Sequence, residues 1–182
     1  MTGDRGRTAL LLVDLVHPFD FEGAEVLAER ARRLVSPLSD LVARARALAI
    51  PVLYVNDHFG RWRASFHQLV ERAADGPGRP LVEALRPDES DYFVLKPHRS
   101  GFYCTPLELL LSDLGRDRLV IVGLTTDMCV LSTVNDARTR RLHTVVPEDG
   151  CEALSDRRHE RALELMELSF DTRVTRCGAL FG

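Results

Sequence analysis

Lysine is scarce in this chain of 182 residues: Lys96 is the only one among the 24 basic residues, and arginine supplies the rest. Because arginine carries the basic charge elsewhere, Lys96 is hard to interpret as one more surface residue. The formal net charge is −3, so the chain lacks the basic excess that nucleic acids and anionic membranes attract. We therefore expect neither of these as a partner, and we expect a small-molecule ligand.

Cysteine is also infrequent, and its spacing matches no zinc-binding pattern such as paired C-x-x-C. The four cysteines are Cys104, Cys129, Cys151 and Cys177. Long apolar runs are absent as well: the first one, residues 8–13, ends at once in Asp14. It is too short for a membrane span and does not resemble a signal peptide. We therefore expect a cytoplasmic protein with reduced thiols.

Apolar runs alternate with amphipathic stretches along the chain, a pattern that predicts a parallel sheet covered by helices. Strands are predicted at residues 8–13, 51–55, 91–95, 118–122, 142–146 and 172–175. Helices are predicted at 25–49, 79–85, 105–114, 128–140 and 155–169, and segment 56–78 is predicted to be a long loop. No repeat or shift of composition marks a boundary. We expect a single domain over residues 1–182, a Rossmann-like three-layer α/β/α sandwich whose six-stranded parallel sheet has helices on both faces.

Three chemically distinctive side chains follow predicted strands. Asp14 follows the first strand, Lys96 follows the third, and Cys129 lies just after the fourth, in the first turn of a predicted helix. The carboxyl ends of parallel strands share one edge of the sheet, where open α/β sheets bind their ligands. We therefore expect these three side chains to lie together at that edge.

Such a group could carry out nucleophilic catalysis. A helix N-terminus and a nearby cation both favour a thiolate, so we predict a lowered pKa for Cys129 and preferential alkylation of its thiol near neutral pH. A carboxylate such as Asp14 can accept the thiol proton and return it to a leaving group. Taken singly, each residue has a plainer interpretation: a cysteine that fills a gap, an aspartate at a bend, and a lysine in an edge ion pair.

Four segments of the chain resemble a known family. They read LLLVDLVHPF, VLYVNDHFGRW, VLKPHRSGFYCTPL and VIVGLTTDMCVLSTVNDA. Together they resemble the isochorismatase-like cysteine hydrolases, which include nicotinamidases, carbamoylsarcosine amidohydrolases, ureidoacrylate hydrolases and isochorismatases. The resemblance runs from about Thr8 to Val174, which is almost the whole chain.

The resemblance implies a catalytic triad of Asp14, Lys96 and Cys129 on a six-stranded parallel sheet. It implies a cis peptide bond between Leu124 and Thr125. It also implies an oxyanion hole made by the backbone N–H groups of Thr125 and Cys129. Finally, it implies assembly as a homodimer or homotetramer.

Loops at the same edge of the sheet are predicted to form the substrate pocket. Phe19 matches a family aromatic residue that faces the substrate, with core packing as the alternative. Asn56 and Asp57 are expected to fix the loop after the second strand, while His58 and Trp62 line or cover the pocket. The predicted pocket residues are Phe19, Asn56, His58, Trp62, His98, Phe102 and Tyr103.

The sequence does not favour a metal site. Nicotinamidases resemble one another in an Asp-x-His metal motif after the second strand, whereas Asp57 and His58 are adjacent here. We therefore expect no metal and no other cofactor, with Asp57, His58 and His67 left open as a weak alternative site.

The presence of Cys129 favours hydrolysis of a C–N bond, because isochorismatases proper, which cleave a vinyl ether, often lack the nucleophilic cysteine. We predict a cysteine hydrolase that acts on a small amide or carbamoyl/ureido substrate through a thioester intermediate. Two alternatives stay open. One is an isochorismatase-type vinyl ether hydrolase that uses Asp14 as its acid, and the other is a non-catalytic member of the fold.

Overall fold

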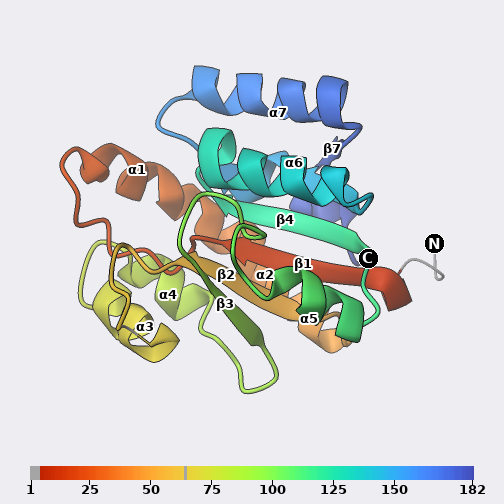
Figure 1. The fold of residues 1–182 in the computed structure, drawn as a ribbon. Helices are drawn as coiled ribbons and strands as arrows, with labels where there is room; N and C mark the ends of the chain where they lie inside the picture. The colour runs from red at the N-terminus through yellow and green to blue at the C-terminus, as the bar shows by residue number, and fades with distance from the viewer. Residues whose placement is uncertain (1–4, 64) are drawn as a thin grey trace.

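The computed structural model describes residues 5–63 and 65–182. Its centre is a parallel sheet flanked by helices on both faces (Figure 1). The strands are β1 (Thr8–Val13), β2 (Val52–Asp57), β3 (Tyr92–Lys96), β4 (Arg118–Leu124), β5 (His143–Pro147), β6 (Cys151–Glu152) and β7 (Arg173–Thr175). Their order across the sheet is β3-β2-β1-β4-β5-β7, with β6 paired to β4. The predicted three-layer α/β architecture is therefore confirmed.

The predicted number of strands is wrong, because the sheet has seven strands and not six. The additional strand, β6, has only two residues and pairs with Gly123 and Leu124 at the end of β4. The neighbouring strand β5 pairs with β4 only as far as Val120. The end of β4 is thus left for another partner, and β6 is too short to produce a pattern in the sequence.

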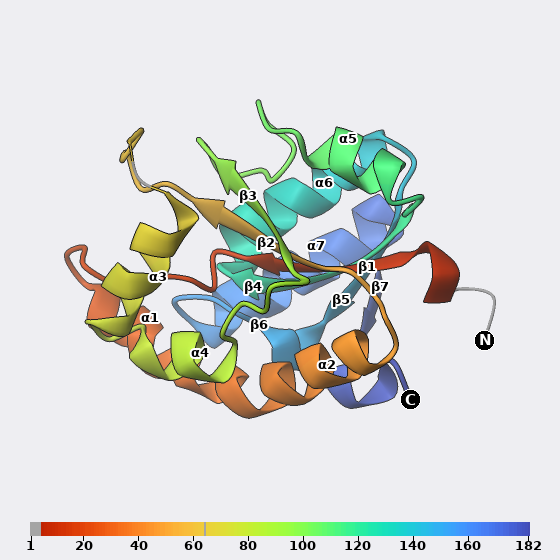
Figure 2. The same cartoon turned by 90° about the horizontal axis from the view of Figure 1, so that it is seen from below.

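Two groups of helices cover the sheet. The helices are α1 (Ala24–Ala31), α2 (Val35–Ala47), α3 (Phe66–Ala74), α4 (Arg79–Ala84), α5 (Leu107–Asp113), α6 (Leu131–Thr139) and α7 (Asp156–Phe170). Helices α1 to α4 pack with one face in one apolar cluster, and α5 to α7 pack with the other face in a second cluster. Figure 2 shows α2 and α4 on one side of the sheet and α5 and α6 on the other. None of the described helices has the length and apolar character needed to cross a membrane.

The buried strand β1 separates the two clusters by simple alternation. Leu10 and Leu12 belong to the cluster under α1 to α4, and Ala9, Leu11 and Val13 belong to the cluster under α5 to α7. All five side chains are 0% exposed. Successive residues of a strand point to opposite faces, so a strand that is buried on both faces is apolar throughout.

The helices differ from prediction in two places. The predicted helix 25–49 is interrupted by a 3₁₀ turn at Arg32–Leu34, because Pro37 has no N–H and its ring conflicts with the carbonyl group four residues earlier. Helix α3 lies inside the segment predicted to be a loop. Its start is fixed by Ser65 and Gln68, whose side chains each accept a hydrogen bond from the other's backbone N–H.

The strands β1 and β4 approach each other very closely at their carboxyl ends. Gly123 has a φ of +136°, and a Cβ atom at this position would lie 1.9 Å from the carbonyl oxygen of Val13. Only glycine fits both conditions. This contact brings the end of β4 directly beside Asp14, the residue that follows Val13.

Candidate active site

Lys96, the last residue of β3, is the centre of the site. Its side chain is 0% exposed, and its Nζ lies 2.8 Å from Oδ2 of Asp14 and 3.6 Å from Sγ of Cys129. The same Nζ donates to the backbone carbonyl of His98 at 3.1 Å and lies 3.6 Å from Oδ2 of Asp57. The structure therefore brings together the three side chains that the sequence placed at one sheet edge, and it adds a fourth.

Asp14 is held rigidly at the end of β1. Its backbone has a φ of +51°, and its Oδ1 accepts a hydrogen bond of 2.6 Å from the backbone N–H of Asp57. The Asp14 carboxylate and the Cys129 thiol also influence each other's pKa, so the two groups are electrostatic neighbours. Burial raises the pKa of Asp14 above its ordinary value, and the Lys96 ammonium opposes this rise only in part.

Cys129 lies in a single π-helical turn, Thr126–Val130, that precedes α6. The prediction of an ordinary first α-helical turn is therefore wrong in detail. The Thr125 carbonyl accepts hydrogen bonds from the N–H groups of both Met128 and Val130. The bond from Val130, five residues along the chain, has the π-helical spacing that makes the turn wide. The peptide bond between Leu124 and Thr125 is cis, which confirms that prediction.

The Cys129 turn is tied to its surroundings on both sides. The Thr133 hydroxyl donates to the Cys129 carbonyl at 2.7 Å and accepts from the Gly101 N–H at 3.0 Å, which joins the turn to the loop after β3. On the opposite side, α7 holds the turn through two contacts. Arg158 pairs with Asp127 at 2.5 Å, and His159 bonds the hydroxyl of Thr126 at 2.8 Å.

The predicted lowering of the Cys129 pKa is wrong. Burial and the neighbouring Asp14 carboxylate together raise the pKa of this thiol to about 12, because Lys96 opposes the rise only in part. The partial positive charge of one helix turn is smaller than the cost of burying a thiolate beside a carboxylate. In the resting protein Cys129 is therefore a thiol, and it needs Asp14 as a base.

This charge state predicts how the cysteines react. Iodoacetamide attacks thiolates, so at neutral pH we expect the exposed Cys104 to be alkylated well before Cys129. Peptide mass mapping over a time course measures both rates in one sample, with the buried Cys151 as the slow reference. Alkylation of Cys129 ahead of Cys104 would show that the resting form is a thiolate.

Asp57 is the site residue whose contact with Lys96 sequence reasoning missed, since it was expected to fix a loop and was otherwise considered only as part of a weak alternative metal site. It ends β2, which lies beside β1 and β3 in the sheet. The signal was available: the strand-end rule that selected Asp14 and Lys96 applies equally to a polar residue after the second strand.

Besides His58, three of the predicted pocket residues are buried in the described structure. Phe19 packs in the cluster under α1 to α4, and Phe102 packs in the opposite cluster, with the Arg140 guanidinium 4.9 Å from its ring centre. The amide of Asn56 accepts from the backbone N–H of Val16 and donates to its carbonyl, so Asn56 fixes the loop after β1. A substrate-facing role for these residues stays a prediction.

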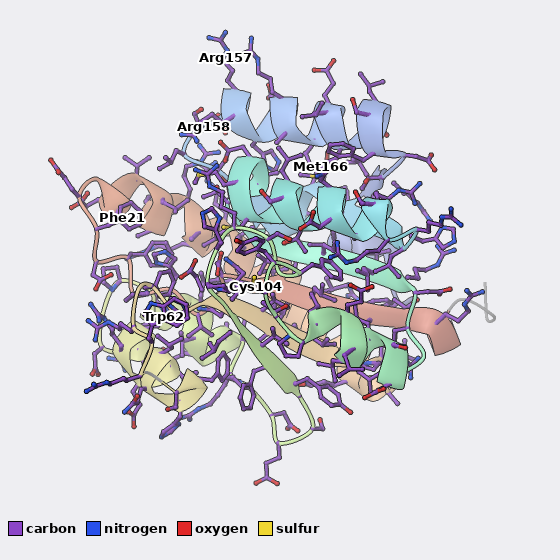
Figure 3. All side chains as sticks on the ribbon, in the orientation of Figure 1. Phe21, Trp62, Cys104, Arg157, Arg158 and Met166 are labelled. Atoms are coloured by element: carbon purple, nitrogen blue, oxygen red, sulfur yellow. The ribbon has the colours of Figure 1, made fainter. Side chains whose placement is uncertain are left out.

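The other predicted pocket residues form two ring pairs. The rings of His58 and Trp62 lie 4.4 Å apart between centres and are tilted by 48°, and the ring of His98 lies 5.9 Å from that of Tyr103. Trp62 is 79% exposed. Figure 3 shows Trp62 on the loop before α3 and Cys104 on the loop before α5. The His58 ring is buried, and neither of its nitrogens has a hydrogen-bond partner in the described part of the chain.

The alternative metal site finds no geometric support. Within residues 5–63 and 65–182, no three His, Cys, Asp or Glu side chains are grouped so that they could hold a metal ion. His67 lies on the surface of α3 and contacts Glu71 at 3.2 Å.

The chain is similar in sequence to known proteins. The Isochorismatase domain model matches residues 8–176. The uncharacterized isochorismatase family protein YaaI of Bacillus subtilis is 35% identical over 167 residues, which cover 92% of each chain. The ureidoacrylate amidohydrolase RutB of Methylobacterium radiotolerans is 29% identical, over 92% of this chain and 76% of its own.

A solved structure shows the same architecture. The N-carbamoylsarcosine amidase from Thermoplasma acidophilum is 27% identical and superposes with a TM-score of 0.76, over 97% of this chain and 99% of its own. With the domain match over residues 8–176 and a relative that is 35% identical, the chain belongs to the isochorismatase family of hydrolases.

Proposed function

We propose that this protein is a cysteine hydrolase that cleaves the C–N bond of a small amide or carbamoyl/ureido substrate through a thioester on Cys129. One observation carries the proposal: the buried Lys96 ammonium contacts both the Asp14 carboxylate and the Cys129 sulfur. A cation in this position stabilises negative charge on either partner. The proton can therefore move between them without changing the net charge of the site.

The first half-reaction forms the thioester. Sγ of Cys129 bonds to the substrate carbonyl carbon while the thiol proton moves to Asp14. The carbonyl oxygen becomes an oxyanion, for which we propose the N–H groups of Thr125 and Cys129 as donors. The C–N bond then breaks, and Asp14 gives its proton to the departing amine or ammonia.

The second half-reaction releases the acid. Water attacks the thioester carbon as Asp14 takes up one of its protons. The C–S bond breaks, and the sulfur regains a proton from Asp14. Asp14 thus acts as base and acid in each half, a task suited to a carboxyl whose pKa is raised by burial.

The names of two relatives support this class of substrate. RutB is a ureidoacrylate amidohydrolase, and the Thermoplasma protein is an N-carbamoylsarcosine amidase. Both names describe hydrolysis at a carbamoyl or ureido nitrogen.

The raised pKa of Asp14 also favours a second candidate function. A carboxyl that keeps its proton at higher pH could protonate a vinyl ether, as an isochorismatase-type hydrolase would require, without any use of the thiol. Substitution of Cys129 separates the two candidates, because only C–N hydrolysis through a thioester depends on the sulfur.

A screen of small amides and ureides tests the proposal, with ammonia release as the readout. We expect at least one N-carbamoyl or primary amide compound to be turned over by the wild-type protein. Turnover confined to vinyl ethers would contradict the proposal. The substrate found in this way is then used to search for an acyl group on Cys129.

A further inference from the structure

Asp57 is a second carboxylate beside Lys96, and the steps proposed above give it no task. Its Oδ2 lies 3.6 Å from Lys96 Nζ, and its Oδ1 accepts a 2.6 Å hydrogen bond from the Phe59 N–H. Its own N–H donates to Asp14 at 2.6 Å. The position of this carboxylate is therefore fixed by β2 and by the loop that follows it, independently of Cys129.

The proposed reaction changes the charge around Lys96. Whenever Asp14 holds the thiol proton it is neutral, and Lys96 loses its closest anionic partner. The Lys96 side chain is 0% exposed, so water cannot solvate its charge in place of that partner. A buried ammonium without an anionic partner is strongly disfavoured and tends to lose its proton.

Few charged groups lie close enough to Lys96 to replace the charge that Asp14 loses on protonation. The described titratable groups that face Lys96 are Asp14, Asp57 and Cys129, together with His17 on the loop after β1. Burial lowers the pKa of His17 to about 4, so it is neutral near pH 7 and supplies no charge. When Asp14 is protonated, Asp57 is therefore the carboxylate that remains within 4 Å of Lys96 Nζ.

We propose that Asp57 is a positioning residue that keeps Lys96 a charged ammonium whenever Asp14 is protonated. Lys96 then stays available to the sulfur and to the developing oxyanion through both half-reactions. This inference rests on the proposed function, because it assigns Asp57 a place in that proton cycle. The balance of forces on Lys96 agrees with it. Burial would lower the pKa of Lys96, but the negative charges around it, those of Asp14 and Asp57 among them, outweigh burial and raise it.

The single lysine makes a direct test possible. Protein labelled with ¹³Cε-lysine gives one side-chain signal in NMR, that of Lys96, and its chemical shift reports the charge of the amine. Asp14→Asn mimics the protonated state of Asp14. We expect Lys96 in this variant to stay charged at neutral pH, and to be neutral in the double variant Asp14→Asn/Asp57→Asn.

Turnover provides a second readout on the substrate found in the ammonia screen. Asp57→Asn should move the loss of activity at alkaline pH to lower pH by about one pH unit and reduce kcat about tenfold, with KM unchanged. Asp57→Glu, which restores the charge, should recover most of both effects. Asp40→Asn, the same change at an exposed position on α2, is the matched control and should alter neither.

The outcomes separate this inference from the proposed function. If Lys96 is neutral at neutral pH in Asp14→Asn, or if it stays charged in the double variant, the role of Asp57 is refuted. The first of these results needs no substitution at Asp57, so it decides the question even if Asp57→Asn does not fold. Full activity of Cys129→Ala would instead refute the proposed function, whatever the charge of Lys96 in the Asp14 and Asp57 variants.

Discussion

Cys129→Ala is expected to abolish turnover of the amide or ureide substrate, by about ten thousandfold or more, while the fold stays intact. No other described side chain offers a nucleophile in contact with Lys96 and Asp14, so the loss of the sulfur removes the covalent route. The substitution removes one partly buried atom, which costs at most about 1 kcal/mol of stability. Initial rates of ammonia release and a thermal melt measure the two effects.

The control for this prediction is Cys104→Ala. Cys104 is an exposed thiol on the loop before α5, so its removal should leave the rate unchanged. A Cys129→Ala variant that keeps most of the wild-type rate on its substrate would favour the vinyl ether alternative, in which Asp14 is the acid and the thiol is dispensable.

Lys96→Met is expected to abolish activity and also to destabilise the fold. Methionine fills a similar volume, but the variant leaves Asp14 buried beside Asp57 without a cation. Removal of one partner from a buried ion pair typically costs about 3–5 kcal/mol. Denaturant unfolding at neutral pH measures the loss. Arg79→Met, which breaks the exposed pair with Glu83, is the control and should cause no measurable change.

The cost of Lys96→Met should depend on pH. Burial raises the folded-state pKa of Asp14 above its ordinary value of 3.8. A raised carboxyl pKa means that protonation favours the folded state, so this contribution is present at low pH and is lost as the pH rises through the folded pKa. Without Lys96 the pKa of Asp14 rises further, because the charge that opposed the rise is gone.

Two directions follow for the variant. The free energy of unfolding of the variant should be closest to that of the wild type in acid, where Asp14 is protonated. The difference between the two should increase as the pH rises from about 4 to neutrality. In the wild type the pKa of Lys96 is also raised, so the contribution of Lys96 to stability is present below its ordinary pKa of 10.5 and is lost only above it. A difference in free energy of unfolding that is constant from acid to neutral pH would show that Asp14 and Lys96 are not electrostatically coupled.

Much of this fold can be predicted from the periodicity of apolar residues and from the residues at the ends of the predicted strands. Residues 8–13 form a continuous apolar run, and β1 has these same bounds. Because the predicted strands are all parallel, the sequence alone predicts that Asp14, Lys96 and Cys129 lie at one edge. The family resemblance added the cis bond between Leu124 and Thr125, which no local pattern predicts.

What the sequence did not predict depends on partners distant in the chain. The two-residue β6 forms only because β5 leaves the end of β4 unpaired. The π-helical turn at Thr126–Val130 depends on the shared Thr125 carbonyl. Helix α3 is a different case, because Ser65 and Gln68 form a capping box, a sequence pattern that predicts the start of a helix.

The sign of the Cys129 pKa shift is the most instructive error. The sequence showed a cation and a helix start near the thiol, and both stabilise a thiolate. It could not show that the thiol is buried beside Asp14. Burial and the charge of Asp14 outweigh the effects of the cation and the helix start on the pKa of the thiol. The corrected sign changes the proposed mechanism, because Cys129 must give its proton to Asp14 as it attacks the substrate.

Mass spectrometry of the intact protein, quenched in acid during turnover, tests the central claim most directly. The substrate is the amide or ureide that releases ammonia in the screen. We predict an added mass equal to the acyl group, which peptide mapping assigns to Cys129 and which is missing from Cys129→Ala. Two results together would contradict the account. One is steady turnover without an acyl adduct, in the wild-type protein or in Asp14→Asn, and the other is an unchanged rate in Cys129→Ala.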